Sequence, residues 1–519
     1  ILAQALLLKF SSSIPHCHCQ RHHHPDCSQA VMNTCCFGFL GKAPARSNGV
    51  TNGHHGKGIV PADRARLQQL LRSGRLVHPM QEASANFADL AHALALCCGL
   101  APERRVRESH ADALAEQLGG TARRHLVFVL CDGMGSSILE RHLVPGSFLR
   151  KRNDPERLLS VFPATTPAAL TTLATAAWPG IHGQPGWDLR DQKGCEFPTK
   201  PTTGPVQLRV LHARVTDMRS NRPAEEFGFS EKDVFVAQPW TDLGKSHRHM
   251  LYVNAYNGTG FTNWYQGPHK ESVRTIPETA MDTLGTPEGS TKALEYFHDA
   301  VDGVVAGVKE AEKQGWQSYI YLYTAHPDKH MHPLGVEHPE VAKVVQGIDA
   351  ELERLWTELH AYDASMVVTA DHGHVSVPPS SMVTLPDDLL ECLEYANIGV
   401  HGKGRHAYFH CRCGRQTEFE ERWGTYSRLR DNFLLLTVEA AASEGLFGPQ
   451  APLPEVRPRL GDFVAISLGA ETLITPEEAA NFRDGCSARC QGAHGSLLPE
   501  ELRIPFILCT PEQCVTCTG

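Results

Sequence analysis

Acidic and imidazole side chains stand directly after several strongly apolar runs of this 519-residue chain. Asp132 ends the run in HLVFVLCDGMG, Asp328 and His332 come after WQSYIYLYTA, and Asp371 and His372 come after ASMVVTA. Burying a carboxylate or an imidazole is unfavourable unless a partner compensates it. Because carboxylates and neutral imidazoles are ligands that suit Zn²⁺ and similar divalent ions, these residue types at these places favour a metal site.

Two further segments add a hydroxyl group and another imidazole. FPATTPAALT places Thr165 and Thr166 at the start of a predicted helix, where free backbone N–H groups and the helix dipole favour an anion such as phosphate. CQGAHGSLLPEEL contributes His494 in a glycine-flanked turn. Taken singly, each residue has an ordinary structural interpretation: Asp132 as a helix cap, the threonines as an N-cap, and an H-x-H pair as coincidence among 29 histidines. Their convergence is what indicates a site.

The elements that must position these residues alternate between apolar runs and amphipathic stretches. This alternation predicts an α/β fold with a largely parallel central sheet and helices on both faces. In such sheets the carboxyl ends of the strands meet at one edge, where sites form. The predicted helices cover 62–74, 84–100, 166–178, 291–315 and 338–363, and the predicted strands cover 125–131, 316–325, 364–370, 403–411 and 503–510. The strand at 403–411 would place His406 in the core or behind the site.

Bulk composition argues against several classes of function. Net charge is −9 and the pI is near 6.4, so no electrostatic argument favours a nucleic-acid polymer or an anionic membrane as partner. No apolar run approaches the roughly 20 residues that a transmembrane helix needs. The 17 cysteines have an odd total and no regular spacing, which does not indicate a disulfide framework. The opening ILAQALLLKF is apolar but lacks the basic segment and cleavage site of a signal peptide, so the cellular compartment stays open. The sequence does not indicate an oligomeric state either.

The two ends of the chain differ from its middle. Residues 1–60 are rich in His, Cys, Ser and Gly without periodicity, which predicts a disordered extension, with metal binding by HCHCQRHHHPDC as the alternative. Cys514 and Cys517 have the spacing of half a zinc site or of a redox pair, although at a tail they need have no function. We expect residues 61–519 to form one catalytic domain.

The motifs together resemble a known family. DGMG, FPATTPAALTTLATAAWPGIHG, PDKHMH, TADHGH and GAHGSLLPEE occur in the order seen in the type I phosphodiesterase/nucleotide pyrophosphatase family of the alkaline phosphatase superfamily. The resemblance runs from about residue 86 to about residue 508, and it is strongest to bacterial-type members. It implies an alkaline phosphatase-like three-layer sandwich, with residues 185–290 as a variable region on the substrate side.

The resemblance also implies a site with two zinc ions, or other divalent ions. One ion would be held by Asp328, His332 and His494, and the other by Asp132, Thr166, Asp371 and His372. Thr166 would also be the nucleophile, because the family's nucleophile stands three residues after a proline that Pro163 matches. Two ions about 4 Å apart suit an in-line displacement at phosphorus. His374 is not needed by this arrangement, and His330 is a competitor for the place of His332.

The expected activity is therefore zinc-dependent hydrolysis of phosphodiester or pyrophosphate bonds in small phosphate esters, through a phospho-threonine. Two departures bear on the substrate. Eukaryotic members have an asparagine for a phosphoryl oxygen where this chain has Ala169, which leaves the specificity for nucleotides open. The arginine that follows the nucleophile in alkaline phosphatases is absent, and this absence favours diesters over monoesters. The alternatives are a phosphomonoesterase or phosphonate hydrolase on the same two ions, and an inactive homologue that only binds metal or ligand.

Overall fold

The computed structural model describes most of the chain. The described residues are 59–102, 107–191, 206–209, 216–217, 231–254, 264–265, 273–275, 283–394, 400–402, 404–483 and 491–512. The predictions made for residues 1–58, for Cys514 and Cys517 and for much of 185–290 lie outside these ranges. The single catalytic domain over 61–519 stays a prediction.

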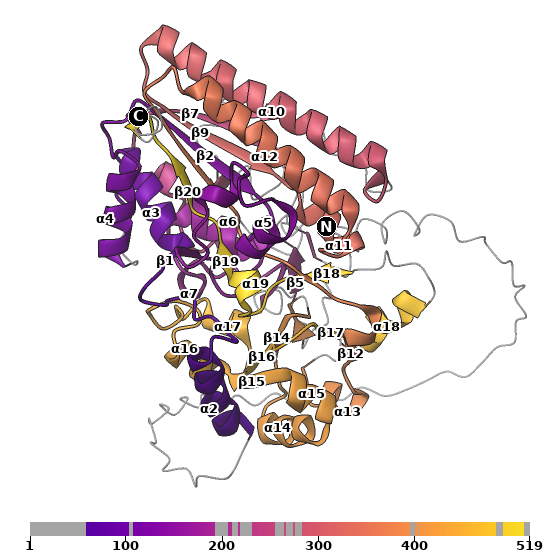
Figure 1. Ribbon diagram of the computed structural model, residues 1–519. Helices are drawn as coiled ribbons and strands as arrows, with labels where there is room; N and C mark the ends of the chain where they lie inside the picture. Colours follow the sequence, from indigo (N-terminus) through magenta and orange to yellow (C-terminus); the bar gives the residue numbers. More distant parts are fainter. Residues whose placement is uncertain are drawn as a thin grey trace, which may run out of the picture.

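A six-stranded sheet forms the centre of the described structure (Figure 1). Its strands stand in the order β20 (Ile507–Cys509), β10 (Ala364–Thr369), β2 (His125–Cys131), β9 (Ser318–Thr324), β7 (His249–Asn254) and β8 (Val273–Thr275). All neighbouring strands are parallel except β20, which runs antiparallel to β10. Every residue of β2, β9 and β10 is buried, as expected of parallel strands that are covered on both faces.

Helices cover both faces of this sheet. On one face lie the long helices α10 (Pro287–Gln314) and α12 (Pro339–Leu359) (Figure 1). Gly307 of α10 packs against Leu251 and Ile320 of the sheet. On the other face, Tyr319 contacts Trp240, whose indole N–H donates to the backbone of α6 (Thr166–Thr175). α3 (Phe87–Cys97) packs on α6 and on α4 (Glu108–Gln117). The structure thus confirms the predicted α/β class with a largely parallel sheet.

A second sheet lies beside the first, and most of its strands are not evident from the sequence. It has four antiparallel strands in the order β13 (Val400–His401), β14 (His406–Phe409), β16 (Phe463–Ser467) and β15 (Phe433–Thr437). Only β14 corresponds to a predicted strand. Tyr408 and Phe409, adjacent on β14, join two different apolar clusters, so this sheet too is buried on both faces.

Smaller elements complete the frame around the site. α11 (Asp328–Leu334) follows β9, and α19 (Pro499–Leu502) precedes β19 (Arg503–Ile504). The two-residue strands β11 (Val375–Ser376) and β18 (Gly492–Ala493) pair with each other. Among the described residues, no helix is both long enough and apolar enough to cross a membrane.

Candidate active site

The carboxyl ends of three parallel strands bring the predicted acidic residues together. Cys131, the last residue of β2, lies opposite Thr324, the last residue of β9, and β10 ends beside them. The turns that follow are joined by backbone hydrogen bonds: the Asp132 N–H donates to the Thr324 carbonyl at 2.9 Å, and the Asp328 N–H donates to the Asp132 carbonyl at 3.0 Å. The side chains of these turns therefore face one edge of the sheet.

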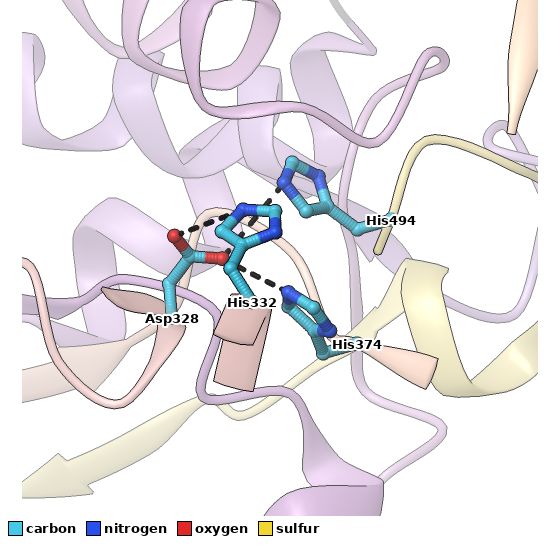
Figure 2. Close-up of side chains that lie close together, drawn as sticks. All are labelled: Asp328, His332, His374 and His494. Atoms are coloured by element: carbon cyan, nitrogen blue, oxygen red, sulfur yellow. Dashed lines mark ion pairs between the residues drawn. The ribbon is translucent and has the colours of Figure 1, made fainter. Parts of the chain in front are cut away.

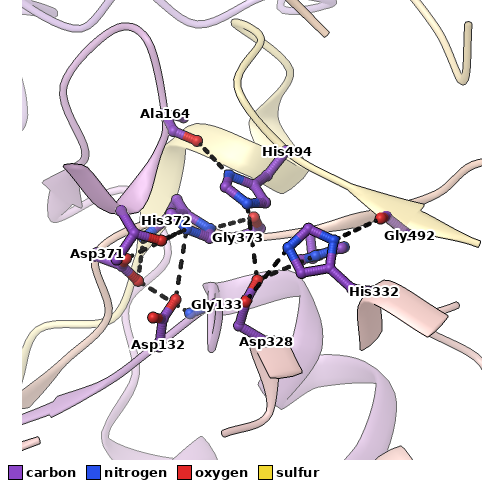
Figure 3. Close-up of polar contacts among 12 residues, drawn as sticks. Asp132, Gly133, Ala164, Asp328, His332, Asp371, His372, Gly373, Gly492 and His494 are labelled. Atoms are coloured by element: carbon purple, nitrogen blue, oxygen red, sulfur yellow. Dashed lines mark hydrogen bonds and ion pairs between the residues drawn. The ribbon is translucent and has the colours of Figure 1, made fainter. Parts of the chain in front are cut away.

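One cluster of candidate metal ligands contains Asp132, Asp371 and His372 (Figure 3). The Nε2 atom of His372 lies 3.2 Å from Asp371 Oδ2 and 3.5 Å from Asp132 Oδ1. The hydroxyl of Thr166 lies 3.1 Å from the same nitrogen. All four side chains are at most 2% exposed. We call these four residues the threonine cluster.

Thr166 reaches this position because it is the first residue of α6. Thr165 before it has extended backbone angles and serves as N-cap, and Pro167 favours the helical angles of the first turn. The hydroxyl of Thr166 is therefore presented at the positive end of the helix dipole, where backbone N–H groups of the first turn lack helical partners.

A second cluster contains Asp328, His332, His374 and His494, and we call it the histidine cluster (Figure 2). One Asp328 oxygen lies 3.4 Å from His332 Nε2, and the other lies 3.2 Å from His374 Nε2 and 3.8 Å from His494 Nε2. Asp328 and His332 are four residues apart on α11, so they share a helix face. The pairing of β11 with β18 brings His374 and His494 side by side.

The two clusters are contiguous. The rings of His372 and His494 stack with centroids 3.6 Å apart and an interplanar angle of 8°. The seven site residues predicted from the sequence, Asp132, Thr166, Asp328, His332, Asp371, His372 and His494, are thus gathered at one place in the structure.

Three of the imidazoles are oriented by backbone carbonyl groups. Nδ1 of His332 lies 2.9 Å from the carbonyl of Gly492, and Nδ1 of His494 lies 2.8 Å from that of Ala164 (Figure 3). His372 is held in the same way, with Nδ1 2.9 Å from the carbonyl of Gly373. Because a carbonyl oxygen only accepts, Nδ1 carries the proton in each ring.

The Nε2 atoms of His332 and His494 then point bare lone pairs at the Asp328 oxygens. Burial lowers the pKa of His332 to about 4 and that of His494 well below its usual value, so these two rings are neutral near pH 7. A neutral ring protonated on Nδ1 has no proton on Nε2 to share with Asp328. Lone pairs that face one another at this distance repel unless a cation lies between them.

Several carboxylate oxygens of the described site likewise lack a hydrogen-bond donor. Among the described residues, Asp132 Oδ1, Asp328 Oδ1 and Asp371 Oδ2 are buried without a hydrogen-bond donor. Burial raises the pKa of Asp132 well above its usual range, and the nearby Asp371 and Asp328 raise it further, against the opposing hydrogen bond from the Tyr323 hydroxyl. Buried like charges and orphaned oxygens of this kind are what a divalent cation neutralises, so both clusters fit metal ions.

Comparison with known proteins identifies the family. Residues 126–497 match the family model of type I phosphodiesterase/nucleotide pyrophosphatase. The chain belongs to this family. The described site lies within the matched residues, and family membership makes the protein a hydrolase of the phosphoric-ester class.

Two other comparisons were made with this phosphodiesterase-family chain, one with curated sequences and one with solved structures. No curated protein sequence matches it. Among solved structures, murine ectonucleotide pyrophosphatase/phosphodiesterase 5 is similar, with 15% sequence identity and a TM-score of 0.46. The match covers 74% of this chain and 87% of the murine chain. Phosphonoacetate hydrolase from Sinorhizobium meliloti is similar with 18% identity and a TM-score of 0.46, covering 74% and 90% of the two chains.

His374, which the arrangement expected from the sequence does not need, also lies in the site. His374 is 1% exposed, its Nε2 faces Asp328, and it belongs to the histidine cluster of this phosphodiesterase-family chain. The signal was present in the sequence as the H-x-H of TADHGH. The turn at Gly373 lets both histidines face the same site, which sequence spacing alone does not reveal.

Three other residues singled out in the sequence lie outside the two clusters. His330 is buried with Nδ1 2.9 Å from His326 Nδ1, so it does not take the place of His332. His406 is fully buried on β14, in agreement with a position in the core or behind the site. Ala169 is buried within α6 and offers no polar side chain to a phosphoryl oxygen.

Proposed function

We propose that this phosphodiesterase-family protein hydrolyses phosphodiester or pyrophosphate bonds of small phosphate esters through a phospho-threonine on Thr166. Two divalent ions, zinc by the choice of ligands, would be held by the threonine cluster and by the histidine cluster. The observation that carries the proposal is the set of unprotonated Nε2 atoms and orphaned carboxylate oxygens that converge beside the Thr166 hydroxyl. Neutral imidazole and carboxylate ligands are the usual donors to zinc.

The position of Thr166 supports its role as the nucleophile. A threonine hydroxyl is a weak nucleophile at neutral pH, and a bound divalent ion lowers the pKa of the hydroxyl and neutralises charge on the leaving oxygen. Attack by Thr166 Oγ1 forms a bond to phosphorus and breaks the bond to the leaving alcohol or phosphate. Water then cleaves the phospho-threonine, which returns the hydroxyl and releases the product.

The start of α6 supports the choice of a phosphoryl substrate. Negative charge that develops on the phosphoryl oxygens would lie against the backbone N–H groups of the first turn. The chain has no arginine directly after Thr166 to hold the extra charge of a monoester. Diesters and pyrophosphates are therefore favoured over monoesters.

The test is hydrolysis of bis(p-nitrophenyl) phosphate by the purified chain. Activity should disappear on chelation and return with Zn²⁺. Thr166→Ala should lower kcat by about 10³-fold or more, because the nucleophile is lost. Thr165→Ala is a matched control, because the side chain of Thr165 makes no capping hydrogen bond and should leave kcat within a few-fold. Full activity of Thr166→Ala would overturn the assignment of the nucleophile.

A substrate panel separates the remaining alternatives. Faster turnover of p-nitrophenyl phosphate than of its diester would indicate a phosphomonoesterase, and turnover of phosphonoacetate alone would indicate a phosphonate hydrolase. Metal binding without turnover of any phosphate ester or phosphonate would indicate a binding protein.

A further inference from the structure

A fully buried ion pair joins the second sheet to the short helix α19. Arg405, directly before β14, donates from Nη2 to Glu501 Oε2 at 2.7 Å and from Nε to Glu501 Oε1 at 3.2 Å. Both side chains are 0% exposed. The third nitrogen, Nη1, donates to Ser467 Oγ at 2.8 Å and to the carbonyls of Gly469 and Glu471, all at the end of β16 or just after it. These hydrogen bonds to the second sheet hold the guanidinium in place independently of its contact with Glu501.

Glu501 in turn contacts the two loops that carry the site histidines. Its Oε1 atom accepts the N–H of Ser496 at 3.1 Å, two residues after His494. Its backbone carbonyl accepts the N–H of Gly373 at 2.8 Å, between His372 and His374. One residue thus holds the segments that supply an imidazole to the threonine cluster and two imidazoles to the histidine cluster.

The fit around Gly373 shows that α19 sets the path of this loop closely. A Cβ atom on Gly373 would collide with the carbonyl oxygen of Glu500, the neighbour of Glu501. The loop therefore runs directly against α19, and a shift of Glu501 would displace Gly373 and the histidines beside it.

Stability alone does not account for this ion pair. Removing two charges from water is unfavourable, and apolar side chains of similar volume often replace a buried ion pair without loss of stability. An apolar side chain at position 501 could not accept the Ser496 N–H, however. What the carboxylate adds is the placement of the loop that bears His494.

We propose that Glu501, held in place by Arg405, is a positioning residue that sets the spacing between the His372–His374 loop and the His494 loop, and through it the metal affinity of both clusters. The second sheet would thereby be part of the metal site although it supplies no ligand to it. This inference rests on the metal-binding part of the proposed function.

The test compares two double variants of the full chain that both lack the buried arginine charge. In Arg405→Met with Glu501→Leu, the acceptor for Ser496 is lost, and we expect Zn²⁺ affinity to fall by about 10- to 100-fold, as for other groups that orient metal ligands. In Arg405→Met with Glu501→Gln, the amide oxygen can still accept the Ser496 N–H, and affinity should recover most of that loss. Competition with a chromophoric chelator measures the affinity, and the absorption spectrum of bound Co²⁺ reports the ligand geometry.

A variant of another ion pair controls for general loss of stability. Arg107 pairs with the buried Asp89 of α3 at 2.8 Å, and its other side-chain hydrogen bonds go to the backbone carbonyls of Gln81 and Ser84. Arg107→Met should lower the melting temperature but leave Zn²⁺ affinity and the Co²⁺ spectrum unchanged.

The outcomes separate this inference from the proposed function. If the wild-type chain binds no divalent ion, both fail. If it binds metal and cleaves the diester, but the leucine double variant folds with unchanged affinity and spectrum, only the positioning role is wrong. Should that variant fail to fold, Arg405→Lys, which keeps the charge and loses the paired hydrogen bonds, decides the matter: weaker Zn²⁺ binding supports the inference, and unchanged binding overturns it.

Discussion

Single residues of the site share one way of being oriented. His332, His372 and His494 each direct Nδ1 to a backbone carbonyl, so the tautomer and the ring orientation are fixed before any ion binds. His374 lacks this support, because its Nδ1 has no hydrogen-bond partner among the described residues. Its ring is therefore held chiefly by packing and by its contact with Asp328.

The replacement His374→Ala tests whether this fourth residue belongs to the metal site. We expect it to weaken Zn²⁺ binding by about 10- to 100-fold, since either a ligand or the group that holds Asp328 in place is lost. Titration against a chromophoric chelator measures the change. His298→Ala, at an exposed position of α10, is the matched control and should bind Zn²⁺ like the wild-type chain. Equal affinities of all three proteins would show that His374 has no part in metal binding.

At the scale of elements, the turns after β2 and β10 touch through two glycines. A Cβ atom on Gly135 would lie 2.5 Å from the Cα atom of Gly373, and one on Gly373 would strike the backbone of α19. Backbone segments cannot rotate out of the way as side chains can. The approach of these turns, which brings Asp132 close to Asp371, thus depends on the absence of side chains at both positions.

We expect Gly135→Ala and Gly373→Ala each to destabilise the protein by about 1–3 kcal/mol or more, as overpacking of a close contact does. Gly146→Ala is the matched control, because a Cβ atom there would meet no atom within 4 Å and should change stability little. Urea unfolding of the three variants measures the differences. A Gly373→Ala variant as stable as Gly146→Ala would show that the turns can move apart.

Helix α2 (Ile59–Arg72) is held to the second sheet by a carboxyl group whose pKa is shifted. Asp63 Oδ2 accepts the N–H of Leu435 on β15 at 2.7 Å. Burial raises the pKa of Asp63 from 3.8 to about 6, although the Leu435 hydrogen bond and Arg66 oppose the shift. Because the folded pKa exceeds the unfolded one, protonation of Asp63 stabilises the folded state below about pH 4, and this stabilisation is lost as the pH rises through 6.

The variant Asp63→Asn should therefore gain stability relative to the wild-type chain as the pH rises. Between pH 4 and pH 7 the difference in unfolding free energy should move by roughly 2–3 kcal/mol in favour of the asparagine variant. Urea unfolding of both proteins at the two pH values measures this difference, in which the titration of all other groups cancels. A difference that is the same at both pH values would contradict the raised pKa.

For the molecule as a whole, the site destabilises the folded state, because it gathers buried carboxylates whose negative charges repel one another. Bound cations would neutralise these charges. Chelation should therefore lower the melting temperature, and Zn²⁺ should restore it. An ion at 100 times its dissociation constant stabilises the folded chain by about 2.7 kcal/mol. In the double variant Asp132→Asn with Asp371→Asn, whose like charges are removed, the effect of chelator on the melting temperature should be smaller. If neither chelator nor zinc changes the melting temperature of the wild-type chain, the folded state does not bind metal as proposed.

The central sheet could be predicted because its strands carry strong local patterns. β2, β9 and β10 are continuous apolar runs, whereas the helices between them have a clear helical periodicity. Local sequence therefore already distinguishes these strands from these helices. The second sheet has no comparable signal. FLLLT and FVAIS, which form β15 and β16, are five residues long, and periodicity does not distinguish such short apolar runs from pieces of buried helix.

The sequence by itself determined which chemical groups stand at the ends of the strands. Asp132, Asp328 and Asp371 follow apolar runs, and parallel strands must bring such ends to one edge whatever the rest of the chain does. The tertiary structure alone decided the place of His374 and the link from Arg405 to Glu501, because both depend on contacts between segments remote in sequence. Such contacts arise from packing, and packing leaves no local pattern from which they can be predicted.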